Sequence, residues 1–102
     1  MADITAAREA LITRILADDA RASREQRKAA FDNAGLEEPL RTLVDKVARR
    51  ANTVTDEDIS AARAAGFSED QIFEIVVCGA VGQAVRQHDQ ALAALDAAGR
   101  KA

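Results

Sequence analysis

The stretch SEDQIFEIVVCGAVGQAVRQHDQALAALDAAG, residues 68–99, predicts one long helix around which the rest of the chain folds. Ser68 is a favourable N-cap, and Gln71 stands in the capping-box position. No proline interrupts the stretch, and Gly99 followed by basic residues is typical of a helix end. At 1.5 Å per residue this helix would be about 45 Å long, more than a chain of 102 residues needs. We therefore expect part of it to contact another chain.

The predicted long helix changes character along its length. Residues 72–85 (IFEIVVCGAVGQAV) are apolar nearly all round, which predicts burial on every side. Beyond them the apolar positions narrow to one stripe with alternating spacings of four and three residues, typical of contact with one other helix. We name this stripe the seam, and it comprises Val81, Val85, His88, Leu92 and Leu95. Backwards it reaches Cys78 and Glu74, while Gly79 and Gly82 leave room for another backbone to approach.

The composition indicates a small helical protein with a thin core. Hydrophobic residues make up 48% of the chain, but aromatic residues make up only 3%, and tryptophan and tyrosine are absent. Small side chains bury little area in a chain of this length, so we expect it to form homo-oligomers. The formal charge of -3 argues against a nucleic-acid-binding surface, since such surfaces concentrate lysine and arginine.

The single cysteine excludes an intrachain disulfide and favours a cytoplasmic protein. The N-terminal stretch MADITAAREALITRI carries charges within its apolar part, so we do not expect a signal peptide. Residues 72–85 fall short of the roughly 20 apolar residues that a membrane span needs. We expect no cofactor, no bound metal and no membrane partner.

Two short helices are predicted before residue 36. The first begins at Asp3, and its apolar face comprises Ile4, Ala7, Leu11, Ile12, Ile15 and Leu16. The second is capped by Ser23 and closed by Gly35, because glycine accepts the left-handed conformation. The basic residues of the second helix are interpreted as a solvated face, since acidic neighbours dilute their charge. These residues are Arg24, Arg27 and Lys28.

Two further helices are predicted before the long one. The first begins at Pro39, which suits a first turn because it has no amide to leave unsatisfied. The second is capped by Thr55 and ends at Gly66. The expected buried positions are Leu40, Leu43, Val44, Val47 and Ala51 in the first and Ile59, Ala62 and Ala65 in the second. Residues 56–58 are acidic, and charge at a helix start explains them better than a metal site.

The predicted fold is all-α, with about five helices and a long C-terminal helix in an oligomeric bundle. The chain, residues 1–102, is expected to be one domain. Residues 1–53 would form the N-terminal helices, and residues 54–99 would form a helix, a turn and the long helix.

The stretch VTDEDISAARAAGFSEDQIFEIVVCGAVGQAVR, residues 54–86, carries a resemblance to a known family. A helix ending in Ala-Gly is followed by a capped helix that begins with a Gln-Ile pair and a glutamate. In this it resembles the alkylhydroperoxidase D-like and carboxymuconolactone decarboxylase superfamily. The resemblance covers about the C-terminal half of the chain. It implies an all-α fold whose members assemble as dimers, trimers or hexamers.

The chemical signature of that family is absent from the resemblance. Redox-active members carry a Cys-x-x-Cys-x-x-x-His motif on the helix that leads into the Ala-Gly turn. The family spacing places those three positions at Ala51, Val54 and Asp58, none of which has a thiol or an imidazole. Alternatively, the match is to the second half of a longer member, whose motif-bearing half is not part of this chain. Both alternatives imply a related helical protein without the peroxidase cysteine pair.

The long helix carries the candidate site residues, which are Glu74, Cys78, Arg86 and His88. Cys78 lies in the most apolar part, where burial would raise its pKa and make it inert. His88 lies about 15 Å farther along the helix, so these two cannot form a dyad within one chain. An antiparallel helix of a second chain could bring His88 towards Cys78 or Glu74. Arg86 would suit a carboxylate substrate, but it could equally pair with Asp89 or Gln90 in solvent.

Two functions remain as hypotheses. The leading one is a non-catalytic assembly or binding module, whose long helix joins copies of the chain, with another protein as an alternative partner. The rival is an enzyme with a site between subunits. In that enzyme Glu74 would work with His88 or Arg86 in decarboxylase-like acid/base chemistry, or Cys78 would take part in peroxidase-related chemistry.

Overall fold

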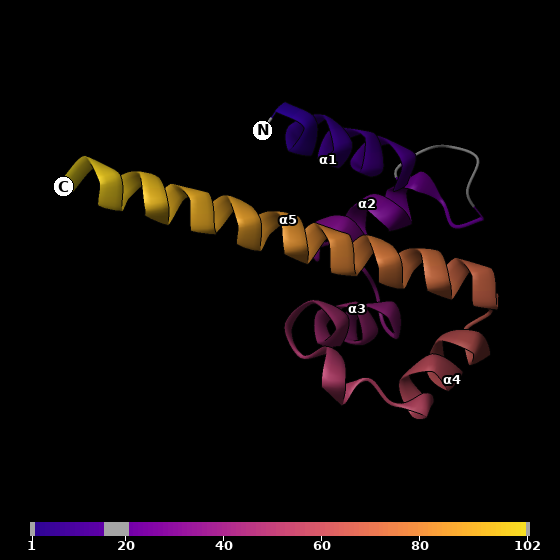
Figure 1. Ribbon diagram of the computed structural model, residues 1–102. Coiled ribbons are helices and arrows are strands. Elements are labelled where there is room, and N and C mark those ends of the chain that lie inside the picture. The colour runs from indigo at the N-terminus through magenta and orange to yellow at the C-terminus, as the bar shows by residue number, and fades with distance from the viewer. Residues whose placement is uncertain (1, 16–20, 102) are drawn as a thin grey trace.

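The computed structural model describes residues 2–15 and 21–101, and these ranges form an all-α protein without strands (Figure 1). The predicted fold class is therefore confirmed. The elements are α1 (Ala2–Ile15), α2 (Arg24–Asp32), α3 (Leu40–Arg49), the short 3-10 helix η1 (Ala51–Thr53), α4 (Asp56–Ala64) and α5 (Glu69–Lys101).

The last helix, α5, is one uninterrupted rod of 33 residues. The predicted capping box precedes it: the Gln71 amide donates to Ser68 Oγ at 3.1 Å, and the Ser68 amide donates to Gln71 Oε1 at 2.8 Å. The helix continues through Gly99 to Lys101, so the predicted end at Gly99 is wrong by two residues. A glycine in the interior of a helix lowers its stability by only about 1 kcal/mol, and α5 continues through Gly99 despite this cost.

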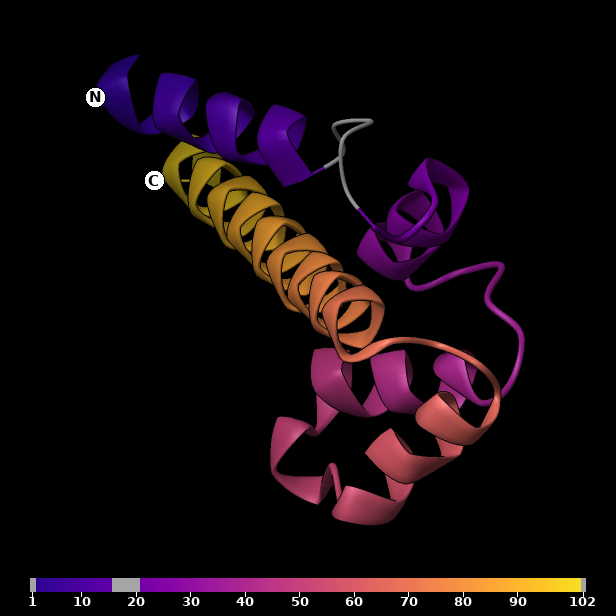
Figure 2. The same ribbon diagram turned by 90° about the vertical axis from the view of Figure 1, so that its right-hand side faces the viewer.

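The hydrophobic core lies against the first half of α5. Figure 2 shows α2 on one side of this half, with α3 and α4 beneath its start. The buried apolar side chains are Ala22, Ala30, Leu36, Leu40, Leu43, Val44, Ala48, Ala62, Ile72, Ile75 and Cys78. In α5 the core residues are Ile72, Ile75 and Cys78, so the core covers only the N-terminal end of this helix.

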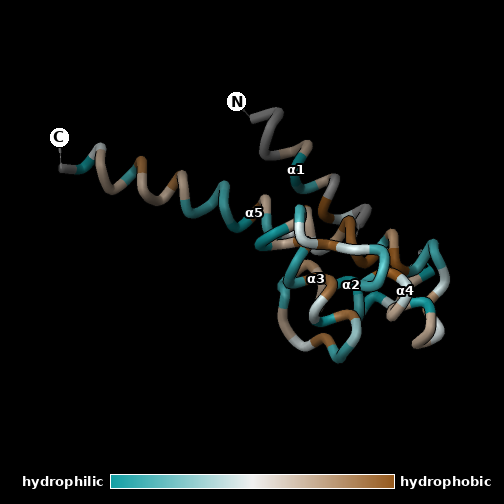
Figure 3. Tube along the Cα trace, turned by 90° about the horizontal axis from the view of Figure 1, so that it is seen from below, coloured by the Kyte–Doolittle hydropathy of each residue, from teal (hydrophilic) through white to brown (hydrophobic). Residues whose placement is uncertain are grey.

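The second half of α5 extends beyond the core as an arm, residues 87–100, every residue of which is exposed. Figure 3 shows this arm projecting away from the other helices, with hydrophobic positions along it. The molecule measures 54 × 29 × 20 Å, and its radius of gyration is 15.5 Å. A compact chain of this length has a radius of gyration of about 13 Å. None of the helices in the described ranges is both long and apolar enough to cross a membrane.

The first helix, α1, is tied to the base of the arm by an ion pair. The two terminal nitrogens of Arg8 donate to the two carboxylate oxygens of Asp89, at 2.9 and 3.0 Å. The Arg8 guanidinium lowers the pKa of Asp89, and the neighbouring His88 adds a smaller effect in the same direction. Of the predicted apolar face of α1, Leu16 and the side chains of Ile4, Leu11 and Ile15 lie outside the described residues.

The second helix begins and ends with short-range contacts. Ser23 Oγ accepts a hydrogen bond from the Gln26 amide at 3.1 Å, as predicted. The residue that closes the helix is Asn33, with φ of 51°, whereas the prediction was Gly35. Asparagine tolerates the left-handed region better than most residues, and Gly35 adopts positive φ two residues later.

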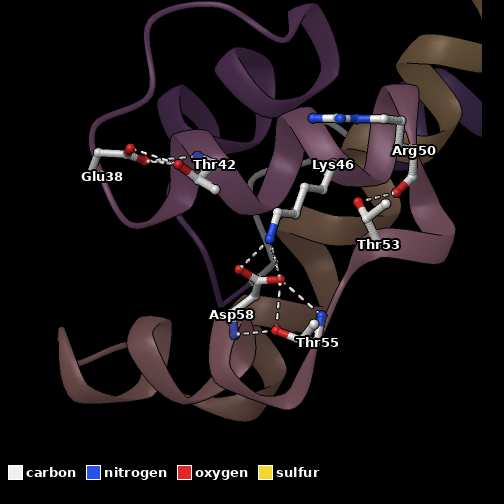
Figure 4. Close-up of polar contacts among 7 residues, drawn as sticks. All are labelled: Glu38, Thr42, Lys46, Arg50, Thr53, Thr55 and Asp58. Atoms are coloured by element: carbon white, nitrogen blue, oxygen red, sulfur yellow. Dashed lines mark hydrogen bonds and ion pairs between the residues drawn. The ribbon is translucent and has the colours of Figure 1, made fainter.

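The fourth helix has a complete capping box that also reaches α3 (Figure 4). The Asp58 amide donates to Thr55 Oγ1 at 3.3 Å, and the Thr55 amide donates to Asp58 Oδ2 at 2.8 Å. Lys46 Nζ donates to both Asp58 oxygens, at 3.0 and 2.9 Å. The Thr55 amide and then Lys46 lower the pKa of Asp58. This acidic residue is therefore explained as a cap and a tie between α3 and α4.

Two predicted core positions are wrong, because their helices end sooner than the pattern implied. Ala51 and Ala65 are both exposed. The third helix stops at Arg49, so Ala51 lies in the tighter turn of η1 and leaves the stripe, while Ala48 is buried instead. Ala65 is the C-cap of α4 and lies beyond its last turn.

Candidate functional site

Glu74 anchors the segment that leads into α2. Its Oε1 accepts a hydrogen bond from the Arg21 amide at 3.0 Å, and its Oε2 accepts one from the Ala22 amide at 2.7 Å. Both oxygens are thus bound by backbone donors immediately before the Ser23 cap. The carboxylate joins two segments that are about 50 residues apart in sequence, which is a structural task.

Cys78 lies in the core, where only 1% of the residue is exposed. Burial raises the pKa of its thiol to about 11, the positive charge of Arg27 opposes that shift, and the negative charge of Glu74 adds to it. Near neutral pH almost every molecule therefore carries the thiol, which is a poor nucleophile. The structure confirms the predicted burial and the predicted direction of the pKa shift.

Arg27 belongs to the same buried region, although the sequence placed it on a solvated face. Only 1% of it is exposed, and its Nε donates to the Ala22 carbonyl at 3.1 Å. The prediction holds for Lys28, which is exposed and pairs with Asp32 at 2.8 Å. Arg27 lies three residues before Ala30, so both residues lie on the face of α2 that packs against α5. This spacing indicates burial, but the charge of Arg27 led to the opposite prediction.

Arg86 binds the C-terminal end of α2. One terminal nitrogen donates to the Phe31 carbonyl, and the other donates to Gln83 Oε1 at 3.0 Å. The sequence offered Asp89 as a partner in solvent, but Asp89 pairs with Arg8. A guanidinium near the last carbonyls of a helix satisfies free acceptors and matches the negative end of the helix dipole. Arg86 is therefore a clamp between α5 and α2.

His88 is half-exposed on the first turn of the arm. Its Nδ1 lies 3.8 Å from Asp89 Oδ1, a longer contact than the one between Asp89 and Arg8. Within one chain the structure brings His88 to Asp89 and keeps it away from the core that holds Cys78. A contact between His88 and Glu74 or Cys78 of a second chain stays a prediction.

An apolar hollow lies where α4 meets the start of α5. Its volume is about 290 Å³, and it is lined by Ile59, Glu69, Ile72, Phe73 and Val76. Phe73 is 69% exposed, so residues 72–85 are not covered on every side, and the prediction of complete burial is wrong for a single chain. None of the four candidate residues lines this hollow.

Labelling of the thiol should separate a structural Cys78 from a reactive one. At about pH 8, a thiol with a pKa near 11 holds about 100-fold less thiolate than one at the ordinary value of 9.0. We expect a disulfide reagent to label native Cys78 at least about 100-fold more slowly than it labels the chain unfolded in urea. The native rate should keep rising with pH above 9.0, because the folded thiol titrates later. Equal rates in both states would contradict a buried structural thiol.

Three of the four candidates thus serve the fold: two hold α2 against α5, and one fills the core. In the described ranges, no group of three or more metal-ligating His, Cys, Asp or Glu side chains comes together. Comparison of the chain with protein-family models, with curated proteins and with solved structures finds no match.

Proposed function

We propose that this chain is a non-catalytic helical module, of the carboxymuconolactone decarboxylase-like kind but without the peroxidase centre, that assembles with copies of itself. The observation that carries the proposal is the arm, on which Leu92 is 51% exposed and Leu95 is 69% exposed. Both leucines lie on the same face of a projecting helix, and at least half of each remains exposed. The lone, buried thiol fits a reducing cytoplasm, which we propose as the compartment.

The exposed area of the chain supports assembly quantitatively. A compact monomer of 10.9 kDa exposes about 5,600 Å², whereas this chain exposes 7037 Å². The excess is about 1,400 Å², and a stable interface buries about 800 Å² on each partner. The surplus is therefore large enough for one specific interface between two copies.

The contacts of the candidate residues support a function without chemistry. A catalytic base or nucleophile needs access to a substrate, and its ionisation has to suit the reaction. Cys78 is buried with a raised pKa, and both oxygens of Glu74 are bound to backbone amides. Arg86 is engaged by the end of α2. Consumption of peroxide by the protein that is lost in Cys78→Ser would contradict this part of the proposal.

Sedimentation equilibrium of the full chain tests the assembly. We expect an oligomer at low micromolar concentration, and we expect Leu92→Asp with Leu95→Asp to raise the dissociation constant at least about 100-fold, since two charges would enter an apolar interface. The matched control, Gln90→Asp with Ala97→Asp, adds the same charge to the opposite face of the arm and should leave the assembly intact. A chain that stays monomeric up to about 100 μM, a dissociation constant too weak for a specific interface, would overturn the proposal.

A further inference from the structure

We infer that the partner of the arm is a second copy running antiparallel, with the two-fold axis passing beside His88. The inference rests on the proposed function and specifies its geometry. An axis of this kind produces a closed pair, in which the same face of both copies is used. An open filament does not result.

The seam reads almost the same in both directions from His88. Val81 lies seven residues before it and Leu95 lies seven after it, while Val85 lies three before and Leu92 four after. Turning one copy around this axis places Val81 level with Leu95 and Ala84 level with Leu92, and it leaves Val85 one residue, about 1.5 Å along the axis, from the level of Leu92. Each apolar side chain of the seam therefore lies beside one of the other copy. The paired region, from 81 to 95, is about 21 Å long.

One flank of the seam is a line of alanines that permits close contact. These residues are Ala84, Ala91 and Ala98, and all three are exposed. In the antiparallel pair, Ala84 of one copy comes within one residue of the level of Ala91 of the other, and Ala98 comes within one residue of the level of Val77. With methyl groups on both sides, the helix axes can approach to about 8 Å, the short end of the usual range.

The position of the core favours the antiparallel over the parallel arrangement. Val77, Val81 and Val85 are each half-buried and precede the arm in α5, whereas Leu92 and Leu95 lie out on the arm. Figures 1 and 3 show α3 and α4 near the first half of α5 and the arm projecting at the other end. An antiparallel copy lays its bare end over the partly covered valines. A parallel copy would leave the two arms packed only on each other, through Leu92 and Leu95.

The charges beside the axis are compatible with the pairing. Asp89 follows His88 directly, so the two copies bring their Asp89 carboxylates towards each other near the axis. Each carboxylate already holds the guanidinium of Arg8 at 2.9 and 3.0 Å, which offsets the repulsion. The helix dipoles of an antiparallel pair also oppose each other favourably.

Disulfide cross-linking in a Cys78→Ala background tests the orientation. Chains with Val81→Cys mixed with chains carrying Leu95→Cys should form a disulfide heterodimer, whereas Leu95→Cys alone should stay reduced. His88→Cys should link to itself. Thiols held together across an interface act at millimolar effective concentration, so we expect linking at least about 100-fold faster than in the control Gln90→Cys, which lies on the opposite face.

Non-reducing gels and mass spectrometry identify each product, and sedimentation of the reduced variants reports assembly independently. Self-linking of Leu95→Cys at the rate expected for the mixed pair would show a parallel seam and overturn the inference alone. An oligomer in which His88→Cys stays reduced would place the axis elsewhere and would also overturn only the inference. A reduced monomer would overturn the inference together with the proposed function.

Discussion

Replacing Gly82 with alanine should destabilise the protein by more than about 3 kcal/mol, although alanine is the better helix former. A Cβ at this position would clash with the Phe31 carbonyl oxygen and would lie 2.6 Å from the carbonyl carbon. Those atoms are backbone at the end of α2, so no side chain can rotate away. To relieve the clash, α2 would have to withdraw from α5 and break the hydrogen bond from Arg86 to Phe31.

Gly99→Ala is the matched control, because Gly99 lies in the same helix and, among the described residues, no atom outside its own turn of helix lies within 4 Å of the added carbon. There alanine should stabilise the chain by up to about 1 kcal/mol through its helix propensity. Urea unfolding followed by far-ultraviolet circular dichroism measures both, since the chain lacks tryptophan and tyrosine as fluorescent probes. Similar changes in the two variants would mean that α2 does not approach α5 at Gly82.

Glu74→Ala is expected to lower the free energy of unfolding by about 2 to 3 kcal/mol. The substitution removes a charged acceptor from two backbone amides, those of Arg21 and Ala22, and the second is partly buried. Glu74→Gln keeps one acceptor oxygen but turns an NH₂ group towards the other amide, so its stability should lie between those of the wild type and Glu74→Ala. A structural anchor predicts this graded loss in the purified chain without any substrate.

The control for that series is Glu69→Ala, which removes a carboxylate from the same helix. Glu69 is exposed and forms a direct, solvent-exposed ion pair with Arg63 at 3.0 Å, so its loss should cost less than about 1 kcal/mol. Urea midpoints for the four proteins give the comparison. If Glu74→Ala unfolds at the wild-type midpoint, Glu74 is not an anchor, and an acid/base role gains weight.

The sequence predicted the starts of α2, α4 and α5 well, because each depends on residues three apart. The predicted start of the first helix at Asp3 is wrong, since α1 already includes Ala2. Ser23, Thr55 and Ser68 all receive the amide hydrogen bond that their spacing implied. The C-terminal ends of the helices were harder to predict, because a helix commonly ends at the first residue along the chain that adopts the left-handed conformation. Asn33 did so before Gly35, while Gly99 did not close α5 at all.

The tertiary roles of the polar candidates were largely hidden from the sequence. Arg86 donates to the backbone carbonyl of Phe31. Every residue has such a carbonyl, so the sequence cannot indicate which one accepts the hydrogen bond. The burial of Arg27 depends on which face of α2 meets α5, and its charge argued for the opposite. The burial of Cys78 was predicted correctly because residues 72–85, which flank it in the sequence, are apolar nearly all round. The resemblance to the carboxymuconolactone decarboxylase superfamily stays a prediction.

The continuity of α5 has a consequence for how the arm meets a partner. Starting a helix is the unfavourable step, whereas adding residues to an existing one is easy. Because the first half of α5 is fixed by its core, the arm grows from a ready template and needs no nucleus of its own. A second molecule therefore meets a surface that is already ordered, and little chain entropy is lost in forming the complex.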